Sequence, residues 1–442
     1  MKIEKLNRHD FARALANGQG KAFLHVKQYG DRGIEKEILY ACLNCQVYDL
    51  LFDKDRSFWL SNVIANSGRM AFYADKILNH LRQDLKPGNT LDQIVFISAE
   101  LFDRGYGEFK PVLEQLFETH RKNGQGDSAL YPAMIDIYAY KGLARAACAM
   151  ESCASIDDWE KDSLFCYACE SLDNEENVTR WFEEKSVGDK QLASFYKAVL
   201  QYRKAETRSM SKRRTRSKGP KTPSYRQALS IINNNNESHL RKIYPLRRFG
   251  KAATEAQLNK LASKLEQEQN PDKIIAYLTE FRDRPLPVVS ERVLSFLFSE
   301  DADLRRSAMN ALCKVKLNDV RSAALKLLAQ GDDESICYGV NLLELNYRST
   351  DRAMLLAKAK EVKDIDNLHW VCNSLIDIGK NCESANFTSL ALWAYENTPC
   401  GFCREQALEI LIKWGKASKR ILFEAQWDAN DDIRILARKT FT

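Results

Sequence analysis

Proline and glycine are scarce in this 442-residue sequence, which contains 10 prolines and 19 glycines. No proline occurs between Pro287 and Pro399, so more than a hundred consecutive residues lack the strongest helix breaker. The alternation of Val, Ile and Thr between turn dipeptides, which is typical of β-strands, is nearly absent. Because 45% of the residues are apolar, the chain can still form a buried core, and these absences favour a folded, helical protein.

Long hydrophobic runs are missing as well. No stretch of 18 apolar residues occurs, so we expect no membrane-spanning helix. The first ten residues contain no apolar core of a secretory signal, and we therefore expect a cytoplasmic protein. Twelve cysteines in such a chain are expected to be reduced thiols packed on helices rather than a disulfide framework.

Motifs of enzyme chemistry are also absent. The six histidines are scattered, without an H-E-x-x-H motif, and we interpret His369 as a packed or surface side chain. The string Asn17–Lys21 is not a Walker A motif, because Leu15 and Ala22 occupy the positions of its required Gly and Ser or Thr. We therefore predict no catalytic residue and no cofactor, and an enzyme remains only an alternative.

One group of cysteines has the spacing of a metal site. Cys148, Cys153, Cys166 and Cys169 superficially match a four-thiolate zinc site. The residues around them predict helix rather than Gly-rich metal-binding turns, so core thiols are favoured and we predict no metal site. The pair Cys400–Cys403 follows a proline at a helix start, where the helix dipole can activate a thiol, but no βαβ pattern supports a thioredoxin-like role.

Helical periodicity recurs along the chain in segments separated by short polar breaks. Clear examples are Gly33–Leu50, Arg56–Ala65, Met70–Leu81, Leu91–Phe102 and Phe109–His120. In Leu91–Phe102 the apolar residues cover more than one narrow stripe, as expected for a helix that packs on neighbours at both sides. The pattern predicts antiparallel helix pairs that stack on one another.

The C-terminal half contains a repeated pattern. Asp303–Ala308 reads D-L-R-R-S-A, Asp432–Ala437 reads D-I-R-I-L-A, and Phe402–Ala407 shares their Arg and Ala positions. Arg305 and Arg404 lie 99 residues apart, which equals three periods of 33. Such a period is typical of solenoids built from helix pairs.

This pattern resembles the HEAT-repeat family, most clearly over residues 254–442. The resemblance implies that the acid caps the first helix of each repeat and that the Arg pairs laterally with an acid of a neighbouring repeat. It also implies that the Ala permits close helix contact. The fold class that we predict is all-α, a right-handed α-solenoid of antiparallel helix pairs, HEAT-like or ARM-like. In residues 1–200 only the helix-pair rhythm is present, so TPR-like pairs remain an alternative there.

Charge is concentrated in two segments. The basic segment, residues 203–226, contains ten Lys or Arg and one Glu, a net charge of +9, whereas the rest of the chain carries −3. The acidic segment, residues 151–184, contains eleven Asp or Glu and two basic residues, a net charge of −9. We therefore predict an N-terminal helical array at 1–202, a basic linker at 203–223 and a C-terminal repeat array at 224–442. A further hypothesis is that the basic segment folds back on the acidic one at low salt.

The leading functional prediction is a non-enzymatic scaffold that binds another protein through a concave helical surface. The first alternative is a nucleic-acid-binding module in a repair or defence assembly, since closely spaced cations bind phosphates. A plain linker or a targeting signal would also explain the basic segment. The second alternative is an enzyme on a HEAT-like scaffold, such as a DNA glycosylase or a lyase. The candidate partner-binding or nucleic-acid-binding residues are Lys212, Arg213, Arg214, Arg216, Lys218, Lys221, Arg241, Lys242, Arg247 and Arg248.

Overall fold

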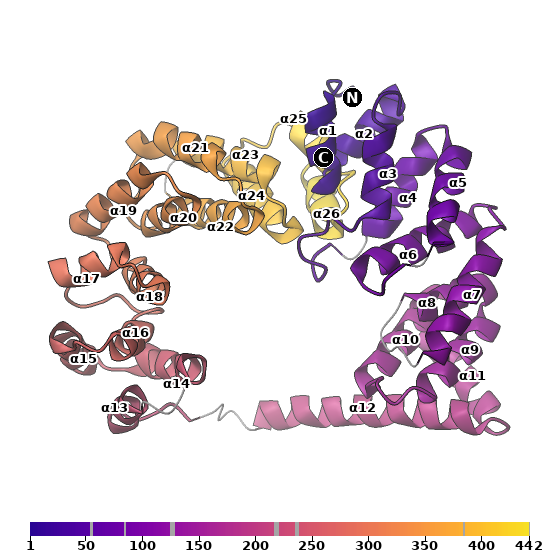
Figure 1. Cartoon of the computed structure of the whole chain (residues 1–442), viewed down its shortest axis with the longest axis horizontal. Helices are drawn as coiled ribbons and strands as arrows, with labels where there is room; N and C mark the ends of the chain where they lie inside the picture. The colour runs from indigo at the N-terminus through magenta and orange to yellow at the C-terminus, as the bar shows by residue number, and fades with distance from the viewer. Residues whose placement is uncertain are drawn as a thin grey trace. The chain divides into compact units, whose positions relative to one another are not determined.

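The computed structural model describes residues 1–53, 56–83, 85–123, 129–215, 221–234, 238–382 and 385–441, with the backbone alone at 209–215, 239 and 240. Within these residues the protein contains 26 α-helices and three short 3-10 helices, and no strand (Figure 1). The prediction of an all-α protein is thereby confirmed. None of the described helices combines the length and the apolar character that crossing a bilayer requires.

The chain divides into two compact units, and each is described by itself. Unit 1 contains residues 1–217 and 419–442, and unit 2 contains residues 218–418. The helices of unit 1 are α1 (Arg8–Ala16), α2 (Gly20–Tyr29), α3 (Glu35–Leu43), α4 (Arg56–Asn66), α5 (Met70–Leu81), α6 (Asn89–Asp103), α7 (Phe109–Lys122), α8 (Leu130–Tyr138), α9 (Tyr140–Glu151), α10 (Asp158–Ser171), α11 (Glu175–Ser186), α12 (Lys190–Thr215), α25 (Lys419–Ala425) and α26 (Asp431–Thr440). Those of unit 2 are α13 (Tyr225–Asn233), α14 (His239–Ala252), α15 (Glu255–Gln267), α16 (Pro271–Glu280), α17 (Glu291–Ser295), η1 (Phe296–Phe298), α18 (Ala302–Leu312), α19 (Asn318–Gln330), α20 (Asp333–Leu342), η2 (Ser349–Asp351), α21 (Arg352–Glu361), α22 (Ile365–Asn381), η3 (Ala385–Phe387), α23 (Thr388–Asn397) and α24 (Gly401–Lys413).

Both units are built by packing each even-numbered helix against the next even-numbered one. In unit 1 this series runs from α2 through α4, α6, α8 and α10 to α12, and in unit 2 from α14 to α24. Odd-numbered helices such as α9, α15, α19 and α23 pack alongside this series. Each helix therefore buries residues on more than one side, which explains the broad apolar faces seen in the sequence.

The C-terminal helices α25 and α26 belong to unit 1, beside α1 and α2 (Figure 1). The ring of Trp427 stacks on Phe23, with centroids 4.9 Å apart, and the backbone carbonyl of Trp427 accepts a hydrogen bond from Trp59 Nε1 at 2.8 Å. A Cβ atom at Gly20 would lie 1.9 Å from the carbonyl oxygen of Glu424, so only glycine permits this close approach of α2. These contacts hold the end of the chain against its first helices.

The observed division differs from the predicted one at two places. Residues 203–215 of the predicted linker continue α12 as helix, and residues 419–442 pack in unit 1 rather than with the array predicted at 224–442. Lys and Arg are good helix formers, so a basic composition does not by itself end a helix that has already begun.

The C-terminal end of α3 also differs from the prediction: the helix was predicted over Gly33–Leu50 and ends at Leu43. Gln93 of α6 donates hydrogen bonds to the carbonyls of Ala41 and Cys42 and so satisfies the C-terminal end of α3.

Ion pairs in unit 2 join helices that are about one repeat apart. Arg305 pairs with Glu334 at 2.6 Å over a separation of 29 residues, in agreement with the lateral pairing that the resemblance to HEAT repeats implied for this Arg. Arg321 contacts both oxygens of Asp351 at 2.6 Å, 30 residues further on. The repeat period found in the sequence therefore corresponds to contacts between neighbouring helix pairs at these positions.

The caps of the repeated helices lie elsewhere than the resemblance implied. The cap of α18 is Asp301, two residues before Asp303, and its Oδ1 accepts hydrogen bonds from two backbone N–H groups of the first turn. The cap of α26 is Asn430, two residues before Asp432. Both helices begin earlier than expected because a side chain that can accept from the backbone already occurs at these positions. Ala308 is fully buried, in agreement with close helix contact.

Candidate functional site

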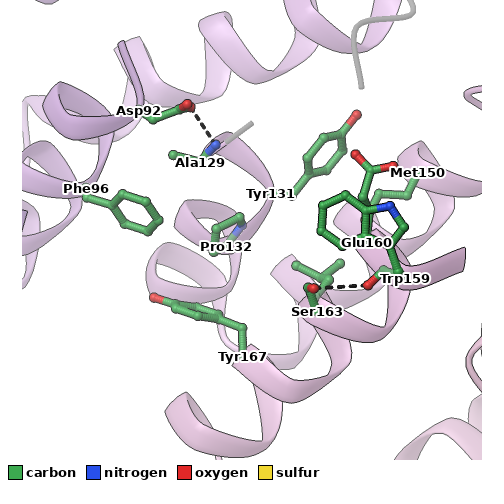
Figure 2. Close-up of a pocket in the computed structure, with 11 residues that line it drawn as sticks. Asp92, Phe96, Ala129, Tyr131, Pro132, Met150, Trp159, Glu160, Ser163 and Tyr167 are labelled. Carbon is green, nitrogen blue, oxygen red and sulfur yellow. Dashed lines mark hydrogen bonds between the residues drawn. The ribbon is translucent and has the colours of Figure 1, made fainter. Parts of the chain in front are cut away.

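A cavity of about 280 Å³ lies in unit 1 on three successive even-numbered helices and is lined by aromatic and acidic side chains (Figure 2). We call it the aromatic–carboxylate pocket. Its lining residues are Asp92 and Phe96 of α6, Ala129, Tyr131 and Pro132 at the start of α8, Met150 of α9, and Trp159, Glu160, Ser163, Leu164 and Tyr167 of α10. None of these described lining residues carries a positive charge.

Helix α10 supplies one wall of the pocket. Trp159, Ser163 and Tyr167 recur at intervals of four residues and therefore share one face of the helix. Glu160 fixes the start of α10, because its Oε2 accepts a hydrogen bond from the backbone N–H of Asp157 at 2.6 Å. Half of the surface of Trp159 is exposed. An exposed indole ring at a pocket mouth is available to a ligand in a way that a core tryptophan is not.

The opposite wall comes from α6 and α8. Asp92 accepts a hydrogen bond from the backbone N–H of Ala129 at 2.9 Å, which ties the start of α8 to α6 (Figure 2). Tyr131 is buried at 4% exposure, and this burial raises its pKa to about 12. Its ring is therefore a neutral aromatic surface at any physiological pH.

A third carboxyl group lies behind the pocket. The hydroxyl group of Tyr167 donates a hydrogen bond to Asp136 of α8, with O···O distances of 2.8 and 2.9 Å to the two carboxylate oxygens. Burial raises the pKa of Asp136 to about 6, although the hydrogen bond from Tyr167 acts in the opposite direction. Asp136 is not among the lining residues, so its role is to hold the ring of Tyr167 in place.

The acidic segment forms one wall of the pocket through α10; it begins at the end of α9 and continues through α10 and α11. Eight acids in residues 157–184 are exposed: Asp157, Asp158, Glu170, Asp173, Glu175, Glu176, Glu183 and Glu184. Some have basic partners, as in the pair Arg180–Glu176 at 3.0 Å. With a net charge of −9, the segment keeps a negative potential around the pocket.

One cation of the basic segment contacts the acidic segment. Arg203 of α12 pairs with Asp162 of α10, and its Nη1 lies 2.6 Å from Glu175 Oε1 of α11. Its guanidinium also lies over the ring of Phe165, 4.5 Å from the centroid. This contact is part of the packing of α12 on α10 and α11. The hypothesis of salt-dependent folding back concerns the whole basic segment, and because the side chains of residues 209–220 lie outside the described ones, it stays a prediction.

The structure describes the side chains of five of the ten candidate cations predicted from the sequence. Lys212, Arg213 and Arg214 lie in α12, where the structure describes the backbone alone, and Arg216 and Lys218 lie outside the described residues. Lys221 and Arg241 are exposed.

The other three cations lie on α14, and each is at least partly buried. Lys242 is buried at 5% exposure. Arg247 makes a two-pronged pair with Asp283 at 2.8 Å, and Arg248 is half-buried. The charged groups of Lys242 and Arg247 are therefore largely unavailable to a binding partner, because Lys242 is buried and Arg247 is paired with Asp283.

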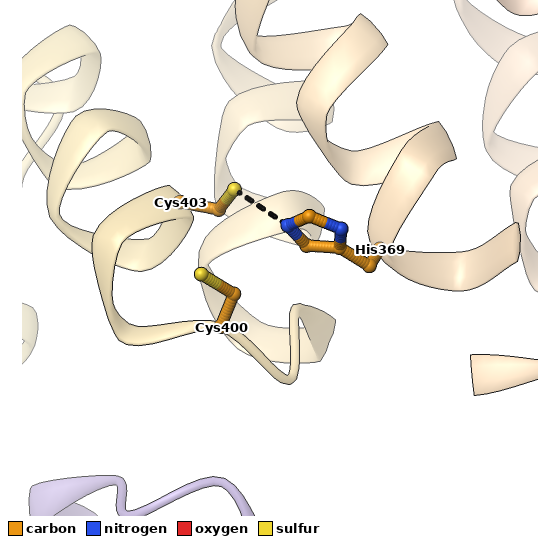
Figure 3. Close-up of side chains that lie close together, drawn as sticks. All are labelled: His369, Cys400 and Cys403. Carbon is orange, nitrogen blue, oxygen red and sulfur yellow. Dashed lines mark hydrogen bonds between the residues drawn. The ribbon is translucent and has the colours of Figure 1, made fainter. Parts of the chain in front are cut away.

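A separate cluster in unit 2 could hold a metal ion. His369 of α22 lies beside Cys400 and Cys403, which stand at the start of α24 (Figure 3). Cys403 Sγ lies 3.2 Å from His369 Nε2, and the three potential ligand atoms are all within 4.8 Å of one another. The hydrogen bond from the Cys403 thiol, with a further one from His369, lowers the pKa of Cys400, and the same bond raises the pKa of Cys403.

The sequence did not predict that these three residues lie close together, because His369 lies 31 residues before Cys400 and on another helix. The alternative zinc site at Cys148, Cys153, Cys166 and Cys169 does not form such a group in the described part of the chain. Nor did the sequence reveal the aromatic–carboxylate pocket, whose residues are spread from 92 to 167. The one usable signal was the recurrence of Trp159, Ser163 and Tyr167 on one helical face within an acidic segment.

Comparison with other proteins adds no identification. No protein-family model matches the chain, and neither a curated protein nor a solved structure shows significant similarity to it.

Proposed function

We propose that this protein is a non-enzymatic binding scaffold that holds a Lys or Arg side chain of a partner protein in the aromatic–carboxylate pocket. The observation that carries this proposal is the lining of the pocket: four aromatic side chains and two carboxylates, without a basic residue among the described ones. Aromatic faces and carboxylates both attract a cation, and the aromatic surface also covers the aliphatic stem of Lys or Arg.

The size of the pocket supports a single side chain as the ligand. Its volume of about 280 Å³ lies just below the range of roughly 300–1,000 Å³ that is typical of sites for drug-sized molecules. The exposed acids of the acidic segment attract a basic partner over a longer distance. A basic peptide would thus be drawn to this face and would place one side chain in the pocket.

The arrangement of helices supports a scaffold. We propose a HEAT-like α-solenoid, since even-numbered helices follow one another and since the pairs Arg305–Glu334 and Arg321–Asp351 join elements about 30 residues apart. Solenoids of this kind bind proteins over extended surfaces. The twelve cysteines, which all lie in the described residues, are free thiols, and this agrees with a reducing compartment such as the cytoplasm.

Catalysis receives less support than binding. A general base needs a carboxylate that can reach the substrate. In the pocket, Asp92 and Glu160 each accept a hydrogen bond from the backbone, and Asp136 lies behind Tyr167. These contacts fit carboxylates that fix helices and provide charge, rather than a proton acceptor.

The nucleic-acid alternative also receives less support. Two of the four candidate cations on α14 are committed within the fold, Lys242 by burial and Arg247 by its pair with Asp283. A phosphate-binding surface needs several cations that are free to release counterions. The candidates that remain are Arg241 and Arg248 of α14 and the basic residues of α12 and of 216–221.

Selection of peptides from a random phage-displayed library on the full-length protein tests the proposal. We expect the selected peptides to be enriched in Lys or Arg, and we expect Trp159→Ala to abolish the enrichment. Tyr40→Ala is the matched control, since it removes a similarly exposed aromatic ring of unit 1 outside the pocket. Enrichment of acidic or purely apolar peptides, or equal enrichment on the Trp159→Ala variant, contradicts the proposed function.

A further inference from the structure

We propose that His369, Cys400 and Cys403 form a zinc site that fastens α22 to α24 in unit 2 (Figure 3). Helices α22 and α24 are successive members of the even-numbered series and pack directly on each other. The cysteines are three residues apart at the start of α24, so both thiols project from the same face of that helix. His369 enters from α22 and points its Nε2 at Cys403 Sγ.

The distances suit a tetrahedral ion after a small adjustment. With Zn–S bonds of about 2.3 Å and Zn–N bonds of about 2.0 Å, ligand atoms of a tetrahedral site lie roughly 3.5–3.8 Å apart. Here the Sγ–Nε2 distance from Cys403 to His369 is 3.2 Å, and no pair in the cluster exceeds 4.8 Å. Side-chain rotations that move the three ligand atoms by about 1 Å or less would therefore bring them to the spacing of a tetrahedral site.

The chemistry of the ligands favours zinc. Thiolate and imidazole together are the ligands that Zn²⁺ prefers among the common divalent ions. Two thiolates and a neutral imidazole around Zn²⁺ carry no net charge, so the site is compatible with the burial of Cys400 and Cys403, at 3% and 2% exposure. A metal ion thus explains why two thiols and a histidine converge in an interior.

Burial also argues against the competing function of a C-x-x-C pair, thiol–disulfide exchange. The attacking thiol of such a pair must reach the disulfide of its substrate. At 3% exposure, Cys400 is not accessible to a protein disulfide.

We assign this ion the role of joining two helices rather than of catalysis. Zinc enzymes place an acid or base beside the metal-bound water. Among the described residues no Asp or Glu joins this cluster, and the polar neighbour of Cys403 is Asn373, with Oδ1 at 4.0 Å from its Sγ. Three protein ligands leave the fourth position to water, a coordination that zinc enzymes share, so the assignment depends on the lack of an acid or base beside the ligands in the described part of the chain.

Metal analysis of the full-length protein, purified under reducing conditions and dialysed, tests the inference. We expect one zinc ion per chain in the wild type and loss of that ion in Cys400→Ser, Cys403→Ser and His369→Ala. Cys313→Ser is the matched control, because Cys313 is a buried cysteine of the same unit outside the cluster, and it should keep the zinc.

X-ray absorption at the zinc edge of the wild type keeps the test independent of how well the variants fold. We expect a first shell of two sulfur atoms and two nitrogen or oxygen atoms. Two outcomes overturn the inference: folded wild type that binds no added zinc, or zinc that persists in the ligand variants.

Discussion

Replacement of Glu280 by Gln should change how the stability of unit 2 depends on pH. Glu280 is the last residue of α16 and is fully buried. Within the described structure, neither of its carboxyl oxygens has a hydrogen-bond partner. Helix α14 packs so closely there that a Cβ atom at Gly250 would lie 1.9 Å from the carbonyl oxygen of Glu280. The charged form of this buried carboxyl would have neither a partner nor full solvation, and burial therefore raises the pKa of Glu280 to about 9.

The size of the change in folding stability with pH follows from this pKa. Unfolded Glu titrates near about 4.3, so between pH 4.5 and 9 the folded chain retains a proton that the unfolded chain releases. The folded state loses stability relative to the unfolded state as the pH rises through this window, by about 1.4 kcal/mol per pH unit. At pH 7.5 the accumulated loss approaches about 4 kcal/mol as an upper limit. Below pH 4.5 both states are protonated, and the loss vanishes.

Urea denaturation followed by circular dichroism at pH 5.5, 6.5, 7.5 and 8.5 measures this effect. Glu280→Gln preserves the shape and has no proton to release, so its advantage over the wild type should grow by about 1 kcal/mol or more per pH unit. Glu255→Gln, which removes an exposed carboxyl of the same unit, should show no such growth. A constant difference between Glu280→Gln and the wild type across the series would refute the reasoning.

Two further variants test the packing of each unit. Arg321→Ala leaves the carboxylate of Asp351, at 5% side-chain exposure, without its two-pronged partner, so denaturation should show a loss of about 3–5 kcal/mol. The exposed control Arg180→Ala should lose less than about 1 kcal/mol, and equal losses would contradict a buried lateral pair. Trp427→Ala removes the stack on Phe23 and should cost about 3–5 kcal/mol while speeding hydrogen exchange in α1 and α2. Unchanged exchange there would show that α25 and α26 do not stabilise unit 1.

Much of the helical fold could be predicted from periodicity. The predicted segment Met70–Leu81 coincides with α5, and Arg56–Ala65 and Phe109–His120 differ from α4 and α7 by one or two residues at one end. These helices follow local rules, namely apolar spacing and the absence of proline. The predicted helix Gly33–Leu50 was too long. The carbonyls at the end of α3 accept hydrogen bonds from Gln93 of α6, a long-range contact that no local rule contains.

Long-range contacts also explain why the sites were not predicted. The end of the chain packs on its beginning through Trp427 and Phe23, which are some 400 residues apart in sequence. His369 reads as an isolated histidine until α24 places Cys403 beside it. The lateral contact of Arg305, in contrast, agrees with the pairing that the resemblance to HEAT repeats implied, and it joins helices that are near neighbours in sequence.

A double-mutant cycle on one selected basic peptide tests the central claim, that the aromatic–carboxylate pocket holds a cationic side chain. Isothermal titration would compare wild type and Trp159→Ala, each with the peptide and with a version whose key Lys or Arg is replaced by uncharged norleucine. We expect each change alone to weaken binding and the two to be coupled by about 0.5–2 kcal/mol. Strictly additive losses would mean that the cation does not meet this ring, and the proposed function would then have to be abandoned.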